Sequence, residues 1–249
     1  MRNLAAAIRF LTVFRFGNAH DDEKRLPGSV VYFPVVGLLL GLVLVGANNL
    51  SIYAQFNPAL SSALLVILLV LFTGGLHMDG LADTFDGFLS GKTSKDDILN
   101  IMRDPNIGTM GVLAIVSVIV LKFALLLSLS ALMKPEALVL MCVVSRWSLV
   151  FSMTLFPYCR KTGKVSVFID GKKPAIFIAA TMIALLITYL SLQMPGLLIF
   201  AVIAVMTYVF GYFMTKRLGG ISGDTLGASC ELNEVAILFC VYIISRCCL

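Results

Sequence analysis

The chain has 249 residues, of which 59% are hydrophobic and 13% charged, and its formal net charge is +5. A mean hydropathy of +0.97 excludes an ordinary soluble enzyme or binding domain. The length leaves no room for a soluble domain beside several membrane crossings, so we expect residues 1–249 to form a single integral membrane domain. The positive charge is spread over loops, which points to anionic membrane lipid and to no nucleic acid as a partner.

The first apolar stretch of the chain is interrupted by Arg9, and no small-residue cleavage site follows it. A cleavable signal peptide is therefore not expected. Leu4, Ile8 and Leu11 share one face of a helix, whereas Arg2 and Arg9 lie opposite. This pattern predicts an amphipathic helix at the membrane interface.

Later stretches are long and apolar enough to cross a membrane, although the last of them is short. They predict an all-α fold, a polytopic transmembrane helical bundle of about seven spans after the N-terminal amphipathic helix. The predicted spans are Val30–Leu50, Ala59–Leu76, Gly111–Leu132, Ala137–Phe156, Ala175–Leu192, Gly196–Met214 and Ala236–Leu249.

Basic residues are distributed unevenly over the segments between these spans. Fifteen of the 19 Lys and Arg residues lie in alternate segments, starting with the N-terminal one, and two lie in the other segments. The positive-inside rule therefore places the N-terminus and the long loops in the cytoplasm. All acidic residues except Glu136 fall on the same side, including Glu231 and Glu234. We expect a multi-pass protein of the cytoplasmic (inner) membrane whose active site faces the cytoplasm.

Three carboxylates with no basic residue among them follow the apolar run Ala59–Leu76. At about 100° per residue, Asp79, Asp83 and Asp86 project from one helical stripe, so they could converge on a cation. Mg²⁺ is the expected ion because it prefers oxygen ligands and leaves positions open for phosphate oxygens. The alternative is a solvated helix end on which acids cluster. His77 borders the stripe and is better explained as a hydrogen-bonding residue than as a ligand.

The next polar segment, Ile101–Gly111, contains the turn signal Asp104-Pro105. Arg103 could bind a phosphate bidentately, and Asp104 adds a fourth carboxylate. Taken alone, the segment is better explained as a helix–loop–helix turn with an arginine at the membrane edge.

Two basic residues, Lys122 and Arg146, lie inside predicted spans. A buried arginine in a membrane pairs with carboxylates or lines a polar cavity. Lys122 is far from a helix end, so we expect it to face the protein interior as well.

Glycines recur in the segment Lys216–Glu234, and we expect a pliable loop whose N–H groups could cradle a phosphate. Asp224 and Glu231 would share a face if Asp224 opens a helix, but Asp224 could equally be only an N-cap. The basic loop Arg160–Lys173 could attract an anionic substrate, although a positive-inside anchor explains it better.

Together these segments resemble the adenosylcobinamide-GDP ribazoletransferase family, also called cobalamin synthase. The resemblance covers nearly the whole chain in order, and its first and last long motifs are specific. One departure is Lys164, where the family often has a second glycine. The segments that carry the resemblance are GGLHMDGLADTFDG (Gly74–Gly87), MRDPNIGTMG (Met102–Gly111), Ser145-Arg146 and LGGISGDTLGASCELNE (Leu218–Glu234), with FLTVFRFG near the N-terminus and FPVVGLLLG (Phe33–Gly41).

The resemblance implies a magnesium-dependent membrane transferase that joins adenosylcobinamide-GDP to α-ribazole, or to its 5′-phosphate, and releases GMP. This is the last step of cobalamin nucleotide-loop assembly. Asp79, Asp83 and Asp86 are then the metal ligands, and Asp83, Asp86 or Asp104 is the base near the attacking hydroxyl. The number of subunits stays open, a homo-oligomer included. The remaining candidates for contact with substrate or diphosphate are His77, Arg103, Arg146, Lys216, Arg217, Asp224 and Glu231.

Two other functions compete with this interpretation. A CDP-alcohol phosphotransferase also carries a row of aspartates, but it typically has an arginine where this chain has Asp83, and its later aspartate motif is absent here. A cation- or proton-coupled transporter would place acids near the middle of several spans. The predicted concentration of acids on one side disfavours transport.

Overall fold

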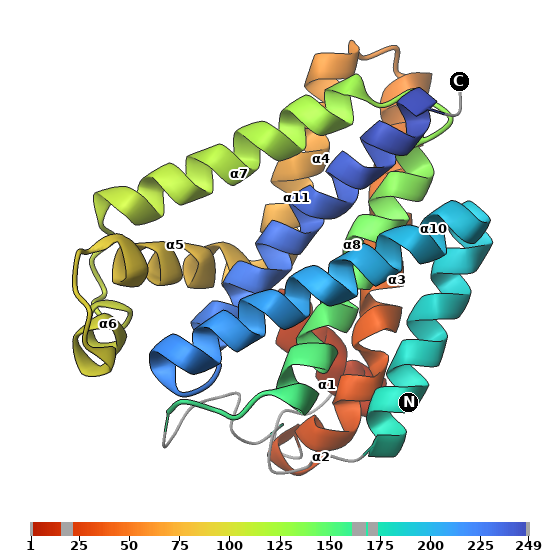
Figure 1. The fold of residues 1–249 in the computed structure, drawn as a ribbon. Helices are drawn as coiled ribbons and strands as arrows, with labels where there is room; N and C mark the ends of the chain where they lie inside the picture. Colours follow the sequence, from red (N-terminus) through yellow and green to blue (C-terminus); the bar gives the residue numbers. More distant parts are fainter. Residues whose placement is uncertain (1, 16–21, 161–167, 169–173, 248–249) are drawn as a thin grey trace.

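The structure is a computed structural model that describes residues 2–15, 22–160, 168 and 174–247. These residues form helices and no β-strand; a single isolated bridge joins Tyr158 to Ile221. The helices in chain order (Figure 1) are α1 (Arg2–Leu11), α2 (Asp22–Ser29), the short 3-10 helix η2 (Val30–Tyr32), α3 (Phe33–Tyr53), α4 (Pro58–Thr73), α5 (Leu76–Leu89), α6 (Lys95–Ile101), α7 (Thr109–Ser128), α8 (Lys134–Leu155), α10 (Pro174–Leu218) and α11 (Gly223–Cys247).

Helix α1 is the amphipathic helix that the sequence predicts. It buries Ala6, Ala7 and Leu11, while Arg2 is exposed. Its apolar face packs on α2 and α3. A short helix with one buried and one charged face is typical of the membrane interface.

A sharp bend between α4 and α5 positions the acidic helix. Helix α4 is capped by Asn57, whose side-chain oxygen accepts a 2.8 Å hydrogen bond from the N–H of Leu60. It ends at Gly74 and Gly75, which have φ values of 62° and 68°, a left-handed conformation that glycine adopts without strain. The two helices are bent by 90°. Helix α5 therefore runs across the end of α4 and does not continue the span.

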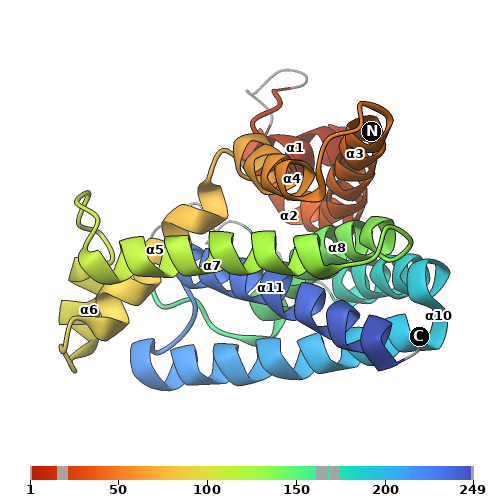
Figure 2. The same ribbon diagram turned by 90° about the horizontal axis from the view of Figure 1, so that it is seen from above.

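Helix α8 lies at the centre of the bundle, with α3 on one side and α10 and α11 on the other (Figure 2). Its most apolar stretch is 83% buried, compared with 17% for α10, which faces outward. Helix α3 approaches α8 closely at Gly37, where the absence of a side chain allows it. A Cβ on Gly37 would lie 2.3 Å from the carbonyl oxygen of Cys142.

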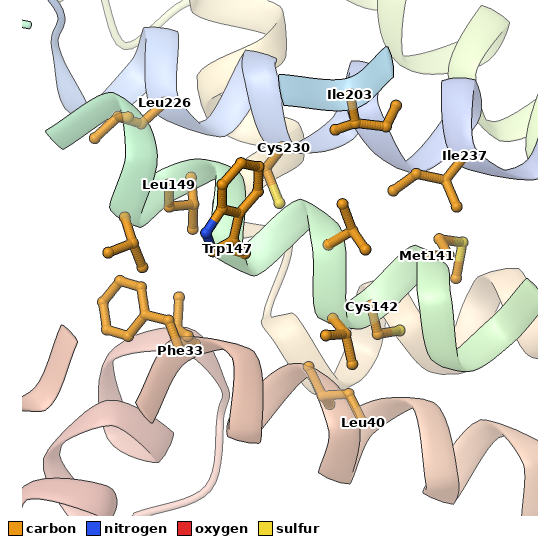
Figure 3. Close-up of a cluster of buried hydrophobic side chains, with 14 of the residues drawn as sticks. Phe33, Leu40, Met141, Cys142, Trp147, Leu149, Ile203, Leu226, Cys230 and Ile237 are labelled. Atoms are coloured by element: carbon orange, nitrogen blue, oxygen red, sulfur yellow. The ribbon is translucent and has the colours of Figure 1, made fainter. Parts of the chain in front are cut away.

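Figure 3 shows the apolar core around α8, where buried side chains from α3, α8, α10 and α11 meet. The labelled core residues are Phe33, Leu40, Met141, Cys142, Trp147, Leu149, Ile203, Leu226, Cys230 and Ile237.

The predicted spans correspond to helices of the structure. Among the described residues, five helices are long and apolar enough to cross a membrane, or six if α4 and α5 count as one bent span. One of the five, the 45-residue α10, is interrupted by non-helical residues at Leu192 and Gln193, close to Pro195. Each of its two parts has roughly the length of one crossing. The separately predicted spans Ala175–Leu192 and Gly196–Met214 therefore both fall within α10.

The C-terminal span begins earlier than predicted. Helix α11 starts at Gly223 and has 25 residues, so it is long enough for a full crossing. Ser222 and Thr225 cap its start reciprocally: the Thr225 N–H donates to Ser222 Oγ at 3.2 Å, and the Ser222 N–H donates to Thr225 Oγ1 at 2.8 Å. The predicted pliable loop Lys216–Glu234 is wrong, because only residues 219–222 separate α10 from α11.

Candidate active site

Small residues allow α5 and α11 to cross in close contact. A Cβ on Gly80 would lie 2.7 Å from the carbonyl oxygen of Asp224, and a Cβ on Gly227 would lie 3.0 Å from that of His77. Neither position has room for a side chain, so the backbones of the two helices touch there. The crossing brings the acidic face of α5 beside Asp224 in the first turn of α11.

Carboxylates crowd at this crossing. Burial, followed by the negative charges of Asp224 and Asp79, raises the pKa of Asp83 to about 7. Arg160 opposes this effect. Asp83 is half-buried and Asp79 is exposed. Asp79, Asp83 and Asp224 therefore share one environment in which negative charge exceeds positive charge.

Asp86 points toward the start of α7 and holds it. Its two carboxylate oxygens accept hydrogen bonds from the N–H of Gly108 at 2.7 Å and from the N–H of Gly111 at 2.8 Å. Gly108 is the N-cap of α7, where backbone N–H groups lack partners within the helix. A negative charge is favourable at that position. Asp86 thus differs from Asp79 and Asp83 in having a structural partner for each oxygen.

Asp104 lies in an exposed turn and not at the crossing. Its Oδ1 accepts hydrogen bonds from the backbone N–H and the side-chain Nδ2 of Asn106, at 2.9 and 2.8 Å. These bonds lower the pKa of Asp104. The turn that the sequence predicts in this segment is therefore present, with Asp104 stabilising it.

A cavity of about 280 Å³ adjoins the crossing. Helix α1, helix α3 and helix α8 contribute only apolar residues to its lining, whereas α5, the segment after α8 and the start of α11 contribute polar ones. Three of the predicted site residues, His77, Asp79 and Asp224, meet there. Burial, followed by the positive charge of Arg146, lowers the pKa of His77 to about 3, so its ring is neutral. The lining residues are Phe10, Phe33, Leu76, His77, Asp79, Gly80, Leu149, Met153, Tyr158, Arg160, Gly223, Asp224, Leu226 and Gly227.

Arg160 joins this group although the sequence did not single it out. The chain after α8 pairs with the chain before α11: the Cys159 N–H donates to the Ile221 carbonyl at 2.9 Å, and the Ile221 N–H donates to the Pro157 carbonyl at 2.8 Å. This pairing brings Arg160 Nη2 to 2.5 Å from Asp224 Oδ2. The first residue of the predicted anchor loop Arg160–Lys173 therefore lines the cavity. The rest of that loop, apart from residue 168, lies outside the described residues.

Two predicted site residues, Arg146 and Glu231, lie in the interior. Arg146 pairs with Glu234, and Lys122 pairs with both Glu231 and Glu234. All four side chains are at most 5% exposed. The prediction that Lys122 and Arg146 face the interior is confirmed. The sequence places Glu231 and Glu234 in a loop, but α11 begins earlier than expected, so both lie in this helix and are buried in the bundle. The side of the membrane predicted for them stays a prediction. The roles predicted for Arg146 and Glu231 in binding substrate stay predictions.

The other predicted cations are exposed. Lys216 lies over the ring of Tyr212, at 5.0 Å from its centroid, and Arg217 is exposed beside it at the end of α10. Burial raises the pKa of Tyr158, and the positive charges of Arg160 and, more weakly, Arg103 oppose this. Arg103 is therefore close enough to influence a residue that lines the cavity.

The donor set at the crossing fits a magnesium ion chemically. Asp79, Asp83 and Asp224 supply carboxylate oxygens, which Mg²⁺ prefers, and their negative charge is only partly compensated. Within the described ranges, no group of three or more His, Cys, Asp or Glu side chains is already close enough to hold a metal ion. Magnesium binding, by the predicted set Asp79, Asp83 and Asp86 or by a set that includes Asp224, stays a prediction.

Comparison with known proteins relates nearly the whole chain to one family. Residues 3–242 match the family described as cobalamin-5-phosphate synthase. An adenosylcobinamide-GDP ribazoletransferase of Desulforamulus reducens is 36% identical over 242 residues, covering 96% of this chain and 95% of the relative. Proteins with the same name from Desulfitobacterium hafniense and Escherichia coli O157:H7 are 34% and 36% identical; these matches cover 96% and 87% of this chain, and 95% and 88% of the relatives. No solved structure matches. The chain therefore belongs to the cobalamin-5-phosphate synthase family.

Proposed function

We propose that this protein is an adenosylcobinamide-GDP ribazoletransferase, which joins adenosylcobinamide-GDP to α-ribazole or to its 5′-phosphate and releases GMP. Relatives with that name align over nearly the whole chain. The observation that carries the proposal is the meeting of Asp79, Asp224 and Arg160 at one cavity, with Asp83 in the same electrostatic environment. Carboxylates beside an arginine suit the transfer of a phosphoryl group.

The reaction exchanges a phosphoanhydride bond for a phosphate ester bond. A hydroxyl oxygen of α-ribazole forms a bond to the phosphorus attached to cobinamide. The bond between that phosphorus and the oxygen bridging to GMP breaks, and GMP leaves with the bonding electrons. The hydroxyl proton passes to a carboxylate. The chain must therefore hold the two substrates in line and supply both a base and compensation for the phosphate charge.

Asp83 is the carboxylate best suited to accept the proton. It lies half-buried on the stripe, within the electrostatic influence of Asp79 and Asp224. The other predicted bases already accept hydrogen bonds. Both carboxylate oxygens of Asp86 accept hydrogen bonds from backbone N–H groups, and Asp104 accepts one that stabilises its own turn. This division separates a reactive carboxylate from a structural one on the same helix.

Arg160 is the cation placed to bind the diphosphate. One of its terminal nitrogens donates to Asp224, and its buried Nε has no hydrogen-bond partner among the described residues. A guanidinium with free donors binds phosphate oxygens strongly. Arg103, Lys216 and Arg217 are exposed and supply a positive field at greater distance.

Asp79, Asp83 and Asp224 are the residues that would hold magnesium, with Asp86 keeping the stripe in place. When bound there, the ion would neutralise negative charge on the diphosphate oxygens.

The charge pattern of the loops supports a site that faces the cytoplasm. The turn between α10 and α11, helix α6 and the end of α8 lie at one end of the bundle, whereas the turns between α3 and α4 and between α7 and α8 lie at the opposite end (Figure 1). The basic residues concentrate at the first of these ends, in agreement with the positive-inside rule. Both substrates would then reach the cavity from the cytoplasm.

The proposal is tested by assaying the purified protein in detergent or liposomes with adenosylcobinamide-GDP, α-ribazole and Mg²⁺. We expect GMP and a cobalamin product in equal amounts. A protein that is folded, as judged by a cooperative thermal transition, yet releases no GMP would overturn the proposal. A parallel assay with CDP-diacylglycerol and an alcohol acceptor should release no CMP, which separates this activity from that of a CDP-alcohol phosphotransferase.

A further inference from the structure

The cavity has one wall that offers no polar side chain. Helices α1, α3 and α8 contribute Phe10, Phe33, Leu149 and Met153 to it. Three of these are nearly fully buried, whereas Phe10 is only partly buried and so has surface left to contact a ligand. This wall has no part in the chemistry assigned to the polar side of the cavity. Side chains of this kind suit an apolar, aromatic part of a ligand.

The ring of Phe10 is held in place by its neighbours. Phe10 and Phe33 stack with their centroids 5.8 Å apart and their planes 14° apart. Phe168 tilts onto Phe10, with centroids 4.7 Å apart. A ring held by two aromatic neighbours in this way is preorganised to contact another aromatic ring.

The size of the cavity selects between the two substrates. Its volume of about 280 Å³ is near the lower limit for a small-molecule site, roughly 300–1,000 Å³, and suits one nucleoside. Adenosylcobinamide-GDP carries a corrin macrocycle and two nucleosides, so it cannot enter as a whole. A neighbouring hollow of about 550 Å³ shares Phe10, Leu76 and Asp79 with the cavity. Ligands in the two spaces would therefore meet at Asp79.

The chemistry of the wall selects between two bases. Guanine has donors and acceptors along its edge, and burying them against apolar side chains would leave them without partners. The base of α-ribazole is a dimethylbenzimidazole, a flat ring with two methyl groups and one ring nitrogen free to accept a hydrogen bond. His77 lines the same cavity, and its buried Nε2 has no partner among the described residues. An imidazole N–H can donate a hydrogen bond to such a nitrogen.

We propose that the apolar wall of Phe10, Phe33, Leu149 and Met153 binds the dimethylbenzimidazole base of α-ribazole, with His77 contacting its ring nitrogen. This inference rests on the proposed function. The ribose then extends toward Asp79 and the polar side of the cavity, while adenosylcobinamide-GDP approaches from the neighbouring hollow. Phe10 is accordingly a specificity-determining residue for one substrate only.

The test compares Phe10→Ala with Phe14→Ala. Phe14 follows α1 and packs on Phe72, outside the lining of the cavity, so it is a matched control for the loss of a ring. Phe10→Ala should raise the Kd of α-ribazole, measured by calorimetry in detergent, and its KM by roughly fivefold to a hundredfold, because one base–aromatic contact is lost. The KM of adenosylcobinamide-GDP should change less than about twofold. Phe14→Ala should alter neither constant.

A second measurement uses the unaltered protein and so does not depend on the folding of a variant. Free 5,6-dimethylbenzimidazole should inhibit competitively against α-ribazole and not against adenosylcobinamide-GDP, and guanosine should not compete with α-ribazole. Guanosine competing with α-ribazole, or Phe10→Ala raising the KM of adenosylcobinamide-GDP instead, would overturn the assignment while leaving the proposed function intact. An unaltered, folded protein that forms no cobalamin would refute the proposed function itself.

Discussion

Gly80 of α5 lies against the backbone of Asp224 in α11, so closely that a Cβ on Gly80 would come within 2.7 Å of the Asp224 carbonyl oxygen. Real Cβ atoms do not approach a backbone oxygen this closely. The separation between the acidic stripe and the start of α11 is therefore set by the absence of one methyl group. Because Asp79, Asp83 and Asp224 sit on either side of this contact, the proposed site depends on it.

Gly80→Ala should push α5 away from α11. We expect turnover to fall by roughly a hundredfold, because a displacement of reacting groups by about 1 Å lowers the rate by that factor. Overpacking should also lower the unfolding free energy by about 1–3 kcal/mol. The matched control is Gly46→Ala in α3, where a Cβ meets nothing within 4 Å; that change should leave turnover intact and stabilise the helix slightly. Turnover and thermal unfolding in detergent measure both effects. Equal activity of the two variants would contradict the proposed role of the crossing.

Asp83→Asn should abolish turnover without destabilising the protein. The substitution removes a half-buried carboxylate that Asp79 and Asp224 repel, so the melting temperature in magnesium-free buffer should stay unchanged or rise. Loss of a general base lowers kcat by roughly 10²–10⁴-fold. Asp96→Asn, at an exposed position in α6, is the control and should behave like the parent protein. If Asp83→Asn lowered the melting temperature markedly, Asp83 would be a structural residue.

Hydropathy and helical periodicity predicted the features that depend on neighbouring residues. The spans follow from apolar runs, and the stripe of Asp79, Asp83 and Asp86 follows from residue spacing within one helix. The interior position of Lys122 was also predictable, because a charged ammonium inside a membrane span is costly to expose to lipid and so faces the protein interior.

The partners of these residues could not be read from the sequence, because they come from distant segments. Asp86 meets Gly108 and Gly111, which lie 22 and 25 residues away. Lys122 meets Glu231, which is 109 residues away. Arg160 looked like one of several loop cations, and only the pairing of its segment with the start of α11 distinguishes it. The predicted C-terminal span began at Ala236, whereas α11 begins at Gly223, so Glu231 was predicted to lie in a loop and is instead buried in a helix.

Asp86→Asn should lower the stability of the start of α7 more than it lowers the catalytic rate. Asparagine keeps one acceptor oxygen but loses the charge that favours the helix N-terminus, so we expect a loss of about 0.5–2 kcal/mol in unfolding free energy. Hydrogen exchange should accelerate at the amides of Gly108 and Gly111, whose N–H groups donate hydrogen bonds to the Asp86 carboxylate. Unchanged exchange together with weakened Mg²⁺ binding would instead make Asp86 a metal ligand, as the sequence alone suggested.

Arg160→Gln should impair the use of adenosylcobinamide-GDP. The guanidinium donates to Asp224 and lines the cavity, so its loss removes a charge-assisted contact to phosphate. Such contacts contribute about 1.5–3 kcal/mol, and we expect kcat/KM for this substrate to fall by roughly tenfold to a hundredfold. Arg217→Gln, at an exposed position, should cost less than about threefold, the size of effect expected for a screened surface charge. Equal losses in the two variants would mean that only the overall positive field matters.

Lys122→Met tests the charge cluster in the interior. The ammonium of Lys122 pairs with both Glu231 and Glu234. Its removal leaves Glu234 paired with Arg146 and leaves Glu231 buried without an ion pair among the described residues. Breaking a buried ion pair on one side costs about 3–5 kcal/mol, because the remaining charge is uncompensated. The double variant Lys122→Met/Glu231→Leu leaves the neutral pair of Arg146 and Glu234, so it should recover most of the lost stability. Thermal unfolding of both variants decides the matter: a double variant no more stable than the single one would show that the cost comes from lost packing and not from unbalanced charge.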